Sequence, residues 1–482
     1  MSLTGRGADS APLDSLTQSS TNKNAALILL VASHFMLNLD SAIIEVALPS
    51  IKEGLDFSFS GLSWVANSYI LTFGGFLLLG GRLGDVFGGR RVFTWGLVAF
   101  GCASLLGGVA PSAGAVVAAR AAQGIAAAAI SPTALSLLVG LYPDRTPEER
   151  VHRLKALGTL GAIAAAGGTA GYFLGGVLTE FIGWQATFLI NVPAAALAVC
   201  YSYRLLPPDR MKAERKRIGL ASATTASMAM TLLVYAFVGS DPSNLLSTRT
   251  CGVLVLALGL LGFVVVNQKR SADPLFPLRI LRIPHIRGAN AVAALINMSM
   301  GPVIFFLSLY IQQVLDYGPL VAGLAILPIV AMVSLSSRLT GNLLARFSVR
   351  TVMVGGLVLF GTGLLWLAGI SGHAYWTEVL GPECLIGFGG GFVFVTFTVA
   401  GTGELDEHDT GAASGLLTTA QKVGSALGLA LLSTVTGAVS AGSGHDHTVT
   451  AGYQAAMLAA AIPVAAAVAV SVRWLPGSTV RQ

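Results

Sequence analysis

Fourteen long apolar segments limit what this chain can fold into. Each runs for about 18 residues or more, which is the length an α-helix needs to cross the hydrocarbon core of a bilayer. A spanning segment must satisfy its own backbone hydrogen bonds, so the pattern predicts an all-α polytopic membrane protein. The segments lie near residues 25–48, 62–80, 92–110, 113–141, 156–179, 186–203, 218–239, 251–268, 288–313, 319–343, 351–370, 375–401, 411–437 and 451–472.

Composition agrees with a membrane protein. Hydrophobic residues make up 54% of the chain and charged residues 11%, whereas a soluble protein is about 25% charged. The formal net charge of +6 needs no nucleic-acid partner, because polytopic proteins gather basic residues in cytoplasmic loops. The four cysteines have no paired spacing, so we expect neither a disulfide framework nor a metal site.

The positions of Lys and Arg predict the topology. With both termini in the cytoplasm, Lys52 and Arg249 fall in external loops and most other basic residues are cytoplasmic. This asymmetry follows the positive-inside rule, in which acidic residues such as those of the loop 404–409 have little weight. Three basic residues lie within spans: Arg120, Arg338 and Lys422.

Basic loops divide the spans into six, two and six. Two similar halves are a common plan in secondary transporters, which bind their substrate between the halves near the middle of the membrane. Residues 1–24 are polar and lack the features of a signal peptide. We therefore predict a disordered cytoplasmic tail at 1–24, an N-terminal six-helix bundle at 25–206, a linker with two extra transmembrane helices at 207–287, a C-terminal six-helix bundle at 288–475 and a cytoplasmic tail at 476–482.

The first span carries an unusual set of polar side chains. His34, Asn38, Ser41 and Glu45 share one face of the helix, and Asp40 lies about 140° around the axis from Glu45. An acid at this depth is costly and tends to be kept for a function. We interpret Asp40, with Glu45, as a site that loads and releases a proton, and the other three residues as candidates to line a substrate cavity. Alternatively, Asp40 pairs permanently with a base and only stabilises packing.

Arg120 is the candidate partner of Asp40. Both lie roughly 12–14 Å below the external surface at about 1.5 Å per residue. Gln123, one turn further along the fourth span, is another candidate to line the cavity. Glu383 and Lys422 are predicted either to form a structural ion pair, which we favour, or to contact substrate.

Glycines concentrate at two further places. A cluster of glycines and charges follows the second span and could latch one conformation and release it in another, or be an ordinary basic loop; it comprises Gly81, Gly84, Asp85, Gly88, Arg90 and Arg91. The glycine spacing of the fifth span predicts close packing against a neighbouring helix. These glycines are Gly158, Gly161, Gly167, Gly168, Gly171, Gly175 and Gly176.

Several of these segments resemble the motifs of one family, the fourteen-span drug:proton antiporters of the major facilitator superfamily. The residues around Asp40 are similar to its first-span motif, and the run from Gly81 to Arg91 is similar to its signature loop. The resemblance extends from about residue 25 to 475, with the motifs in the family's order. The other matching segments are Arg120-Ala121-Ala122-Gln123-Gly124, Gly171 with Gly175-Gly176, Gly183-Trp184 with Asn191-Val192-Pro193, and Gly411-Ala412-Ala413-Ser414-Gly415.

The resemblance implies the major facilitator fold and specific residue roles. Asp40 would be a protonation or substrate residue, Arg120 would help proton transfer, and the 81–91 loop would form part of a conformational lock. Gly168, Gly171, Gly175 and Gly176 would form the antiporter motif that shapes a bend. Two departures matter here: Glu45 adds an acid where the family has Asn, and Tyr172 replaces the expected proline.

We therefore expect a proton-coupled antiporter, not an enzyme, that exports small hydrophobic drugs or antibiotics and confers resistance. It would lie in the bacterial plasma (inner) membrane as a monomer, and would use the proton gradient because the sequence has no nucleotide-binding loop and implies no cofactor. The alternatives are export or import of an endogenous metabolite, or a membrane-embedded sensor or enzyme. The last is the least favoured, because His34 and the tripeptide His445-Asp446-His447 have no catalytic or metal-binding partners at a suitable spacing.

Overall fold

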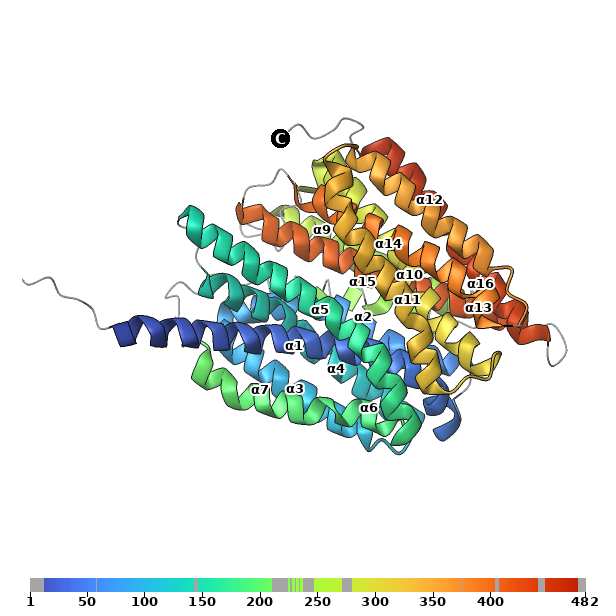
Figure 1. Cartoon of the computed structure of the whole chain (residues 1–482), viewed down its shortest axis with the longest axis horizontal. Coiled ribbons are helices and arrows are strands. Elements are labelled where there is room, and N and C mark those ends of the chain that lie inside the picture. The colour runs from blue at the N-terminus through green and yellow to red at the C-terminus, as the bar shows by residue number, and fades with distance from the viewer. Residues whose placement is uncertain are drawn as a thin grey trace, which may run out of the picture.

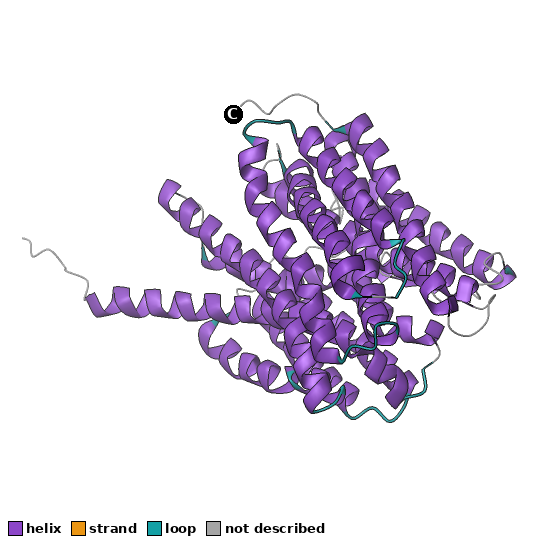
Figure 2. Ribbon diagram, turned by 45° about the vertical axis from the view of Figure 1, so that its right-hand side comes forward, coloured by secondary structure: helices purple, strands orange, loops and turns teal. Residues whose placement is uncertain are grey.

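The regular structure of this protein is helical over the part of the chain that its computed structural model describes (Figure 2). This result confirms the all-α prediction. The described residues are 13–57, 59–142, 146–209, 224–225, 228–229, 231–233, 235–236, 247–270, 280–372, 374–403, 407–440 and 447–475.

The helices of the first part of the chain are α1 (Leu13–Gly54), α2 (Phe59–Phe87), α3 (Gly89–Gly108), α4 (Ala113–Leu141), α5 (Pro147–Phe181), α6 (Gln185–Leu189) and α7 (Asn191–Leu205). Helix α9 (Thr248–Arg270) and the short 3-10 helix η1 (Ile280–Arg282) follow. The last part contains α10 (Pro284–Gln313), α11 (Pro319–Leu344), α12 (Val349–Leu367), α13 (Tyr375–Glu378), α14 (Leu380–Thr402), α15 (Glu407–Ser440) and α16 (His447–Trp474).

Eleven helices in the described residues are long and apolar enough to cross a membrane. Helix α2 adds a twelfth span if its two parts, Gly61–Leu77 and Leu79–Phe87, are taken together across their 49° bend. These twelve match twelve of the predicted segments. Helix α9, with its shorter apolar stretch Thr248–Val264, covers the predicted segment at 251–268. The remaining segment, 218–239, lies largely outside the described residues, as do 210–217 and 404–406.

Local sequence determines where several helices begin. The side chains of Ser112, Thr146 and Ser348 each accept a hydrogen bond from the backbone N–H three residues later. Such N-caps satisfy a donor that the first helical turn would leave unpaired. Proline stands in the first turn of α5, α10 and α11, where its fixed φ suits the helix and its missing N–H costs nothing.

The spanning helices form two groups (Figure 1). In the N-terminal group, α2 and α3 pack on α4, α1 packs on α5, and α3 packs on α7. In the C-terminal group, α12 and α11 pack on α14, and α10 packs on α15 and α16. Several helix crossings depend on missing side chains: a Cβ on Gly80 would lie 1.9 Å from the carbonyl oxygen of Ala128, and a Cβ on Gly389 would lie 2.4 Å from that of Gly356. Small residues allow such close approach in membrane bundles.

The helix ends gather at two faces of the bundle. We call the face where α1 begins and α16 ends the terminal face, and the face where α1 ends and α16 begins the opposite face. Among the described residues, three hydrogen bonds join the two groups close to the opposite face. Ser308 Oγ donates to the carbonyl oxygen of Glu45 (2.9 Å), Gln312 Nε2 donates to that of Val46 (3.1 Å), and the N–H of Leu320 donates to Glu180 Oε2 (3.1 Å).

Candidate functional site

Asp40 forms a buried ion pair with Arg120. Asp40 is 0% exposed and Arg120 is 1% exposed. The guanidinium Nη1 donates to Asp40 Oδ2 at 2.6 Å. The pair joins α1 to α4, and in a low-dielectric interior two such charges are stable only when they face each other with good geometry.

Two amides complete the environment of this carboxylate. Gln123 Nε2 donates to Asp40 Oδ1 at 3.0 Å, and Asn191 Nδ2 of α7 donates to the same oxygen at 2.7 Å. Gln123 also accepts from Arg120 Nη1 at 3.0 Å and donates to Ser104 of α3 at 2.8 Å. Asp40 therefore accepts from three donors and donates to none, which is the pattern of an ionised carboxylate.

Helix α2 fixes the other side of Arg120. The guanidinium Nε donates to the carbonyl oxygen of Val65 at 3.2 Å, and its carbon lies 4.2 Å from the ring centroid of Tyr69. A cation over an aromatic face gains electrostatic stabilisation that increases when water is excluded. Helices α1, α2, α4 and α7 thus converge on one charged pair, and α3 is linked to it through Gln123.

The second polar face of α1 points elsewhere. Asn38 is exposed in the middle of the helix, and its Nδ2 donates to the carbonyl oxygen of His34 at 2.8 Å. His34 Nε2 lies 3.4 Å from Ser131 Oγ of α4. His34, Ser41 and Glu45 are half-buried. The structure therefore separates these four residues from Asp40, which faces the interior of the N-terminal group.

Glu45 lies where the two groups meet. Tyr172 of α5 donates to Glu45 Oε2 at 3.0 Å. Lys422 of α15, half-buried, is close enough to attract the Glu45 carboxylate electrostatically. The Lys422 ammonium lies 5.0 Å from the ring centroid of Phe73, and a Cβ on Gly74 would lie 2.8 Å from Lys422 Cβ. An acid and a base from different groups thus face the same interface.

The favoured ion pair between Glu383 and Lys422 is wrong. Glu383 is 0% exposed, and its Oε2 lies 2.8 Å from the hydroxyl of Tyr375. That hydroxyl is also 2.8 Å from the carbonyl oxygen of Ala325. The pairing fails because the two side chains point in different directions: Glu383 faces α11 and α13, while Lys422 faces α2. Neither residue forms an ion pair within 4.0 Å among the described residues.

The cluster after the second span makes its contacts within the N-terminal group. Gly81 and Gly84 pack on α4, where a Cβ on Gly84 would lie 2.7 Å from Thr133 Cγ2. The side chain of Asp85 is 65% exposed and lies 3.7 Å from Arg82 Nη1, one turn earlier. In this conformation Asp85 thus faces solvent at the terminal face.

Asp209 connects this cluster to the end of α7. Its carboxylate accepts from the N–H groups of Arg90 (2.8 Å) and Arg91 (3.2 Å), at the start of α3. Arg90 Nη1 donates to the carbonyl oxygen of Leu206 at 3.4 Å. Gly88 has φ +97°, and a Cβ there would lie 2.2 Å from Asp209 Cγ. This position therefore requires glycine for both its backbone conformation and its contact.

The glycines of α5 divide into two sets. A Cβ on Gly167, Gly171 or Gly175 would lie within 2.5–2.8 Å of α1, and one on Gly176 would lie 2.7 Å from Leu320 Cα of α11. A Cβ on the remaining three would meet nothing within 4 Å; these are Gly158, Gly161 and Gly168. The prediction of a packed face is therefore wrong for these three, Gly168 of the proposed motif included, because they lie on the open side of the helix.

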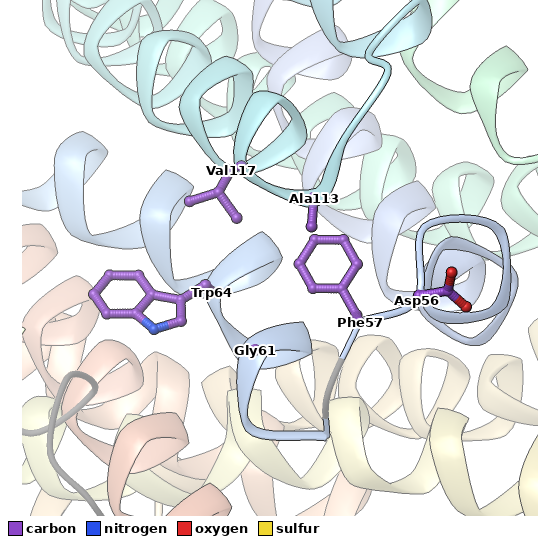
Figure 3. A pocket seen from close by; sticks show the side chains of 7 residues that line it. Asp56, Phe57, Gly61, Trp64, Ala113 and Val117 are labelled. Atoms are coloured by element: carbon purple, nitrogen blue, oxygen red, sulfur yellow. The ribbon is translucent and has the colours of Figure 1, made fainter.

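A cavity of about 430 Å³ opens near the opposite face between α2, α4 and the end of α1 (Figure 3). Asp56, Phe57, Gly61, Trp64 and Val117 are among its lining residues. None of the candidate site residues lines it, and its walls are largely apolar. It is thus separate from the charged pair and from the Glu45 interface.

Several side chains in these networks were missed in the sequence. Asn191 appeared only within a motif, Tyr172 only as a missing proline, and Asp209 and Tyr375 not at all. Asn191 carried a usable signal, since an amide at the start of an apolar span is itself costly. The others are ordinary residues whose role depends on which helix lies beside them.

The comparisons with known proteins agree with this architecture. A family model described as Major Facilitator Superfamily matches residues 30–429. The chain is 37% identical over 445 residues to the cephamycin export protein CmcT of Amycolatopsis lactamdurans, covering 91% of this chain and 89% of the relative. It is 36% identical over 425 residues to the puromycin resistance protein pur8 of Streptomyces alboniger, covering 87% and 83%.

A solved structure shows the same fold. It is a bacterial homologue of the human lysosomal transporter Spinster, in an inward-facing and unoccupied conformation. The TM-score is 0.68 at 14% sequence identity, and the alignment covers 93% of this chain and 96% of that one.

Proposed function

This chain belongs to the Major Facilitator Superfamily, a family of transporters and not of enzymes, and on that premise we propose that it is a proton-coupled antiporter that exports drugs or antibiotics. Its relatives include antibiotic exporters and resistance proteins. Its cargo would be a small, largely hydrophobic molecule, and its action would confer resistance. It would work as a monomer in the bacterial plasma membrane.

The buried Asp40–Arg120 pair is the observation that carries this proposal. A transporter driven by protons needs an acid whose proton affinity differs between two conformations, since a ligand shifts an equilibrium only through differential binding. Here the carboxylate accepts three hydrogen bonds, and the one from Arg120 is also an ion pair. This arrangement suits a conformation from which the proton has already left.

The donors of Asp40 come from different helices, which supports a change of environment during transport. Arg120 and Gln123 lie on α4 and Asn191 lies on α7. A small displacement of α1 against these helices would withdraw donors from the carboxylate and favour its protonation. Proton binding would then favour the conformation in which the donors are further away, and proton release would favour the one described here.

The distribution of contacts between the groups supports alternating access. The hydrogen bonds between them lie near the opposite face, and Asp85 faces solvent at the terminal face. We propose that the groups, residues 25–206 and 288–475, move as two halves. With the terminal face in the cytoplasm, this conformation would be open to the inside and ready to load cargo. The loop at 81–91 would latch the halves together in the other state.

Transport into everted membrane vesicles with an imposed pH gradient tests the proposal. Puromycin, cephamycin and methylenomycin A are suitable probes, since relatives with 28–37% identity are named for them. We expect wild-type protein to accumulate at least one of them when the vesicle interior is acidic, and Asp40→Asn to lose most of this accumulation at equal protein level.

Asp56→Asn is the matched control. Asp56 is an exposed acid with φ 51°, a backbone conformation that Asn tolerates, so this variant should transport at the wild-type rate. Undiminished pH-driven accumulation by Asp40→Asn would disprove the coupling role of this residue.

A further inference from the structure

The carboxyl group of Glu383 lies in an environment unlike that of Asp40. It is 0% exposed, at the first turn of α14. Oε2 lies 2.8 Å from the hydroxyl of Tyr375, and Oε1 is buried without a hydrogen-bond partner among the described residues. A charged carboxylate left this way would be strongly destabilised, because burial removes its hydration and no cation compensates it.

The basic side chains on the neighbouring helices are directed away from the Glu383 carboxyl group. Lys422 of α15 faces Phe73 of α2, and Arg350 of α12 binds the carbonyl oxygen of Leu475. Arg338 of α11 lies about two and a half turns beyond Ile329, the residue level with Gly387 of α14. The nearest titratable neighbours are not cations either. Tyr375, Cys384 and Tyr310 are neutral when protonated. Glu378 is an acid that already accepts hydrogen bonds from Ser371, Gly372 and Tyr310.

The hydrogen-bond geometry favours the protonated form of Glu383. The hydroxyl of Tyr375 has one hydrogen but lies 2.8 Å from two oxygens, Oε2 of Glu383 and the carbonyl oxygen of Ala325. The carbonyl oxygen can only accept. If Tyr375 donates to Ala325, the contact with Glu383 is a hydrogen bond only when Oε2 carries the proton. An ionised Glu383 would leave one of the two short contacts without a hydrogen.

We propose that Glu383 is a second proton-binding site, occupied in the conformation in which Asp40 is ionised. The proton on Oε2 is donated to Tyr375, whose own hydrogen is donated to Ala325. Short helix α13 covers this site at the opposite face, where Trp376 is 74% exposed and Tyr375 is 5% exposed. Tyr375 is thus buried beside the carboxyl group under this short helix, and exchange of the proton with water requires α13 to open.

Infrared difference spectroscopy on the purified full-length protein in lipid nanodiscs at neutral pH tests this inference. The C=O stretching band of a protonated carboxylic acid is separated from the bands of a carboxylate. We expect Glu383→Gln, which is uncharged and nearly isosteric, to remove an acid band. Asp40→Asn, the matched control, should remove carboxylate absorption instead. Loss of carboxylate absorption in Glu383→Gln would overturn the proposal.

Two further measurements keep the test independent of whether the Gln variant folds. Tyr375→Phe retains the acid but removes its acceptor, so the acid band should move towards the frequency of a free carboxyl group. Transfer of the wild-type protein to D₂O should shift the same band, because an exchangeable proton becomes a deuteron. A band that does not respond to Tyr375→Phe, or one that D₂O leaves unchanged, would contradict the proposed hydrogen bond or the proposed exchange. None of these readouts requires the transport substrate, so they are independent of the proposed export function.

Discussion

The two carboxylates of α1, Asp40 and Glu45, lie about 140° apart around the helix axis and have different surroundings. Asp40 is enclosed by donors of the N-terminal group, and Glu45 faces a tyrosine on α5 and a lysine of the C-terminal group. The first environment stabilises a charge through hydrogen bonds within one group. The second makes the charge on Glu45 sensitive to how the two groups are arranged.

Asn191 should contribute measurably to the Asp40 network. Asn191→Ala removes one of three donors from a buried carboxylate, and lost hydrogen bonds to charged groups cost about 1.5–3 kcal/mol. We expect a lower midpoint of thermal unfolding in detergent and reduced pH-driven transport. Asn297→Ala is the control, because the side-chain amide of Asn297 donates to the carbonyl oxygen of Ala293 in its own helix and not to a charged group. Equal losses in both variants would show that Asn191 is an ordinary packing residue.

Glu45 and Lys422 should be energetically coupled. Neutralising either one leaves the other half-buried charge without its attraction, whereas Glu45→Gln with Lys422→Gln removes both charges. Residues that belong to one network of interacting charges typically show interaction energies of roughly 0.5–3 kcal/mol, so the double variant should be more stable than the sum of the single effects predicts. The measurement is a double-mutant cycle on the free energy of unfolding in mixed micelles. Glu45→Gln with Arg350→Gln, on separate faces, should be additive, and an additive result for Lys422 would refute the coupling.

Residue depth could be predicted from the sequence, but residue direction could not. The Asp40–Arg120 contact follows from two helices of opposite direction with charges at equal depth. The Glu383–Lys422 prediction used the same reasoning and failed, because depth says nothing about which neighbour a side chain faces. The rotation of α15 is determined by contacts such as that between Gly74 and Lys422, which join residues far apart in the chain.

At the scale of elements, the contact between α1 and α5 depends on one ridge of glycines. Gly167, Gly171 and Gly175 recur every four residues and bring the α5 backbone against Phe35, Leu39 and Ile43 of α1. The sequence predicted the presence of glycine packing in α5 and the positions of nearly all helices. It did not separate the ridge from the glycines on the open side, because both sets have similar spacing and only the partner helix distinguishes them.

Gly171→Ala and Gly168→Ala form a matched pair for this ridge. The Cβ added at 171 would lie 2.7 Å from both Ala42 Cβ and the carbonyl oxygen of Leu39, while the one added at 168 would meet nothing within 4 Å. Overpacking typically costs 1–3 kcal/mol, so Gly171→Ala should destabilise the protein by about that amount and slow transport. Gly168→Ala should be neutral or slightly stabilising, since alanine favours helix. Thermal unfolding and initial transport rates would check both, and a reversed order would refute the assignment.

For the whole molecule, the contacts between groups predict where a cross-link will stop transport. The N–H of Leu320 donates to Glu180 Oε2 at 3.1 Å, so cysteines at positions 180 and 320, in a background without the native cysteines, should be joined by a short bifunctional methanethiosulfonate reagent. The cross-link should then hold the opposite face closed and abolish pH-driven transport, and a reductant should restore it. The pair Gly168→Cys with Leu320→Cys should not cross-link. Full transport by the cross-linked first pair would rule out opening at this position.

The division of α1 into two faces has a consequence for how such a protein can change over generations of drug exposure. Asp40 and Arg120 are enclosed within one group, whereas His34, Asn38 and Ser41 lie on the other side of α1. Under the proposed function, the range of exported substrates can therefore drift while this proton-coupling pair is inherited intact. Selection of a random library on a new antibiotic, followed by sequencing of the survivors, should enrich substitutions at His34, Asn38 and Ser41 and leave Asp40, Arg120 and the glycine ridge of α5 unchanged.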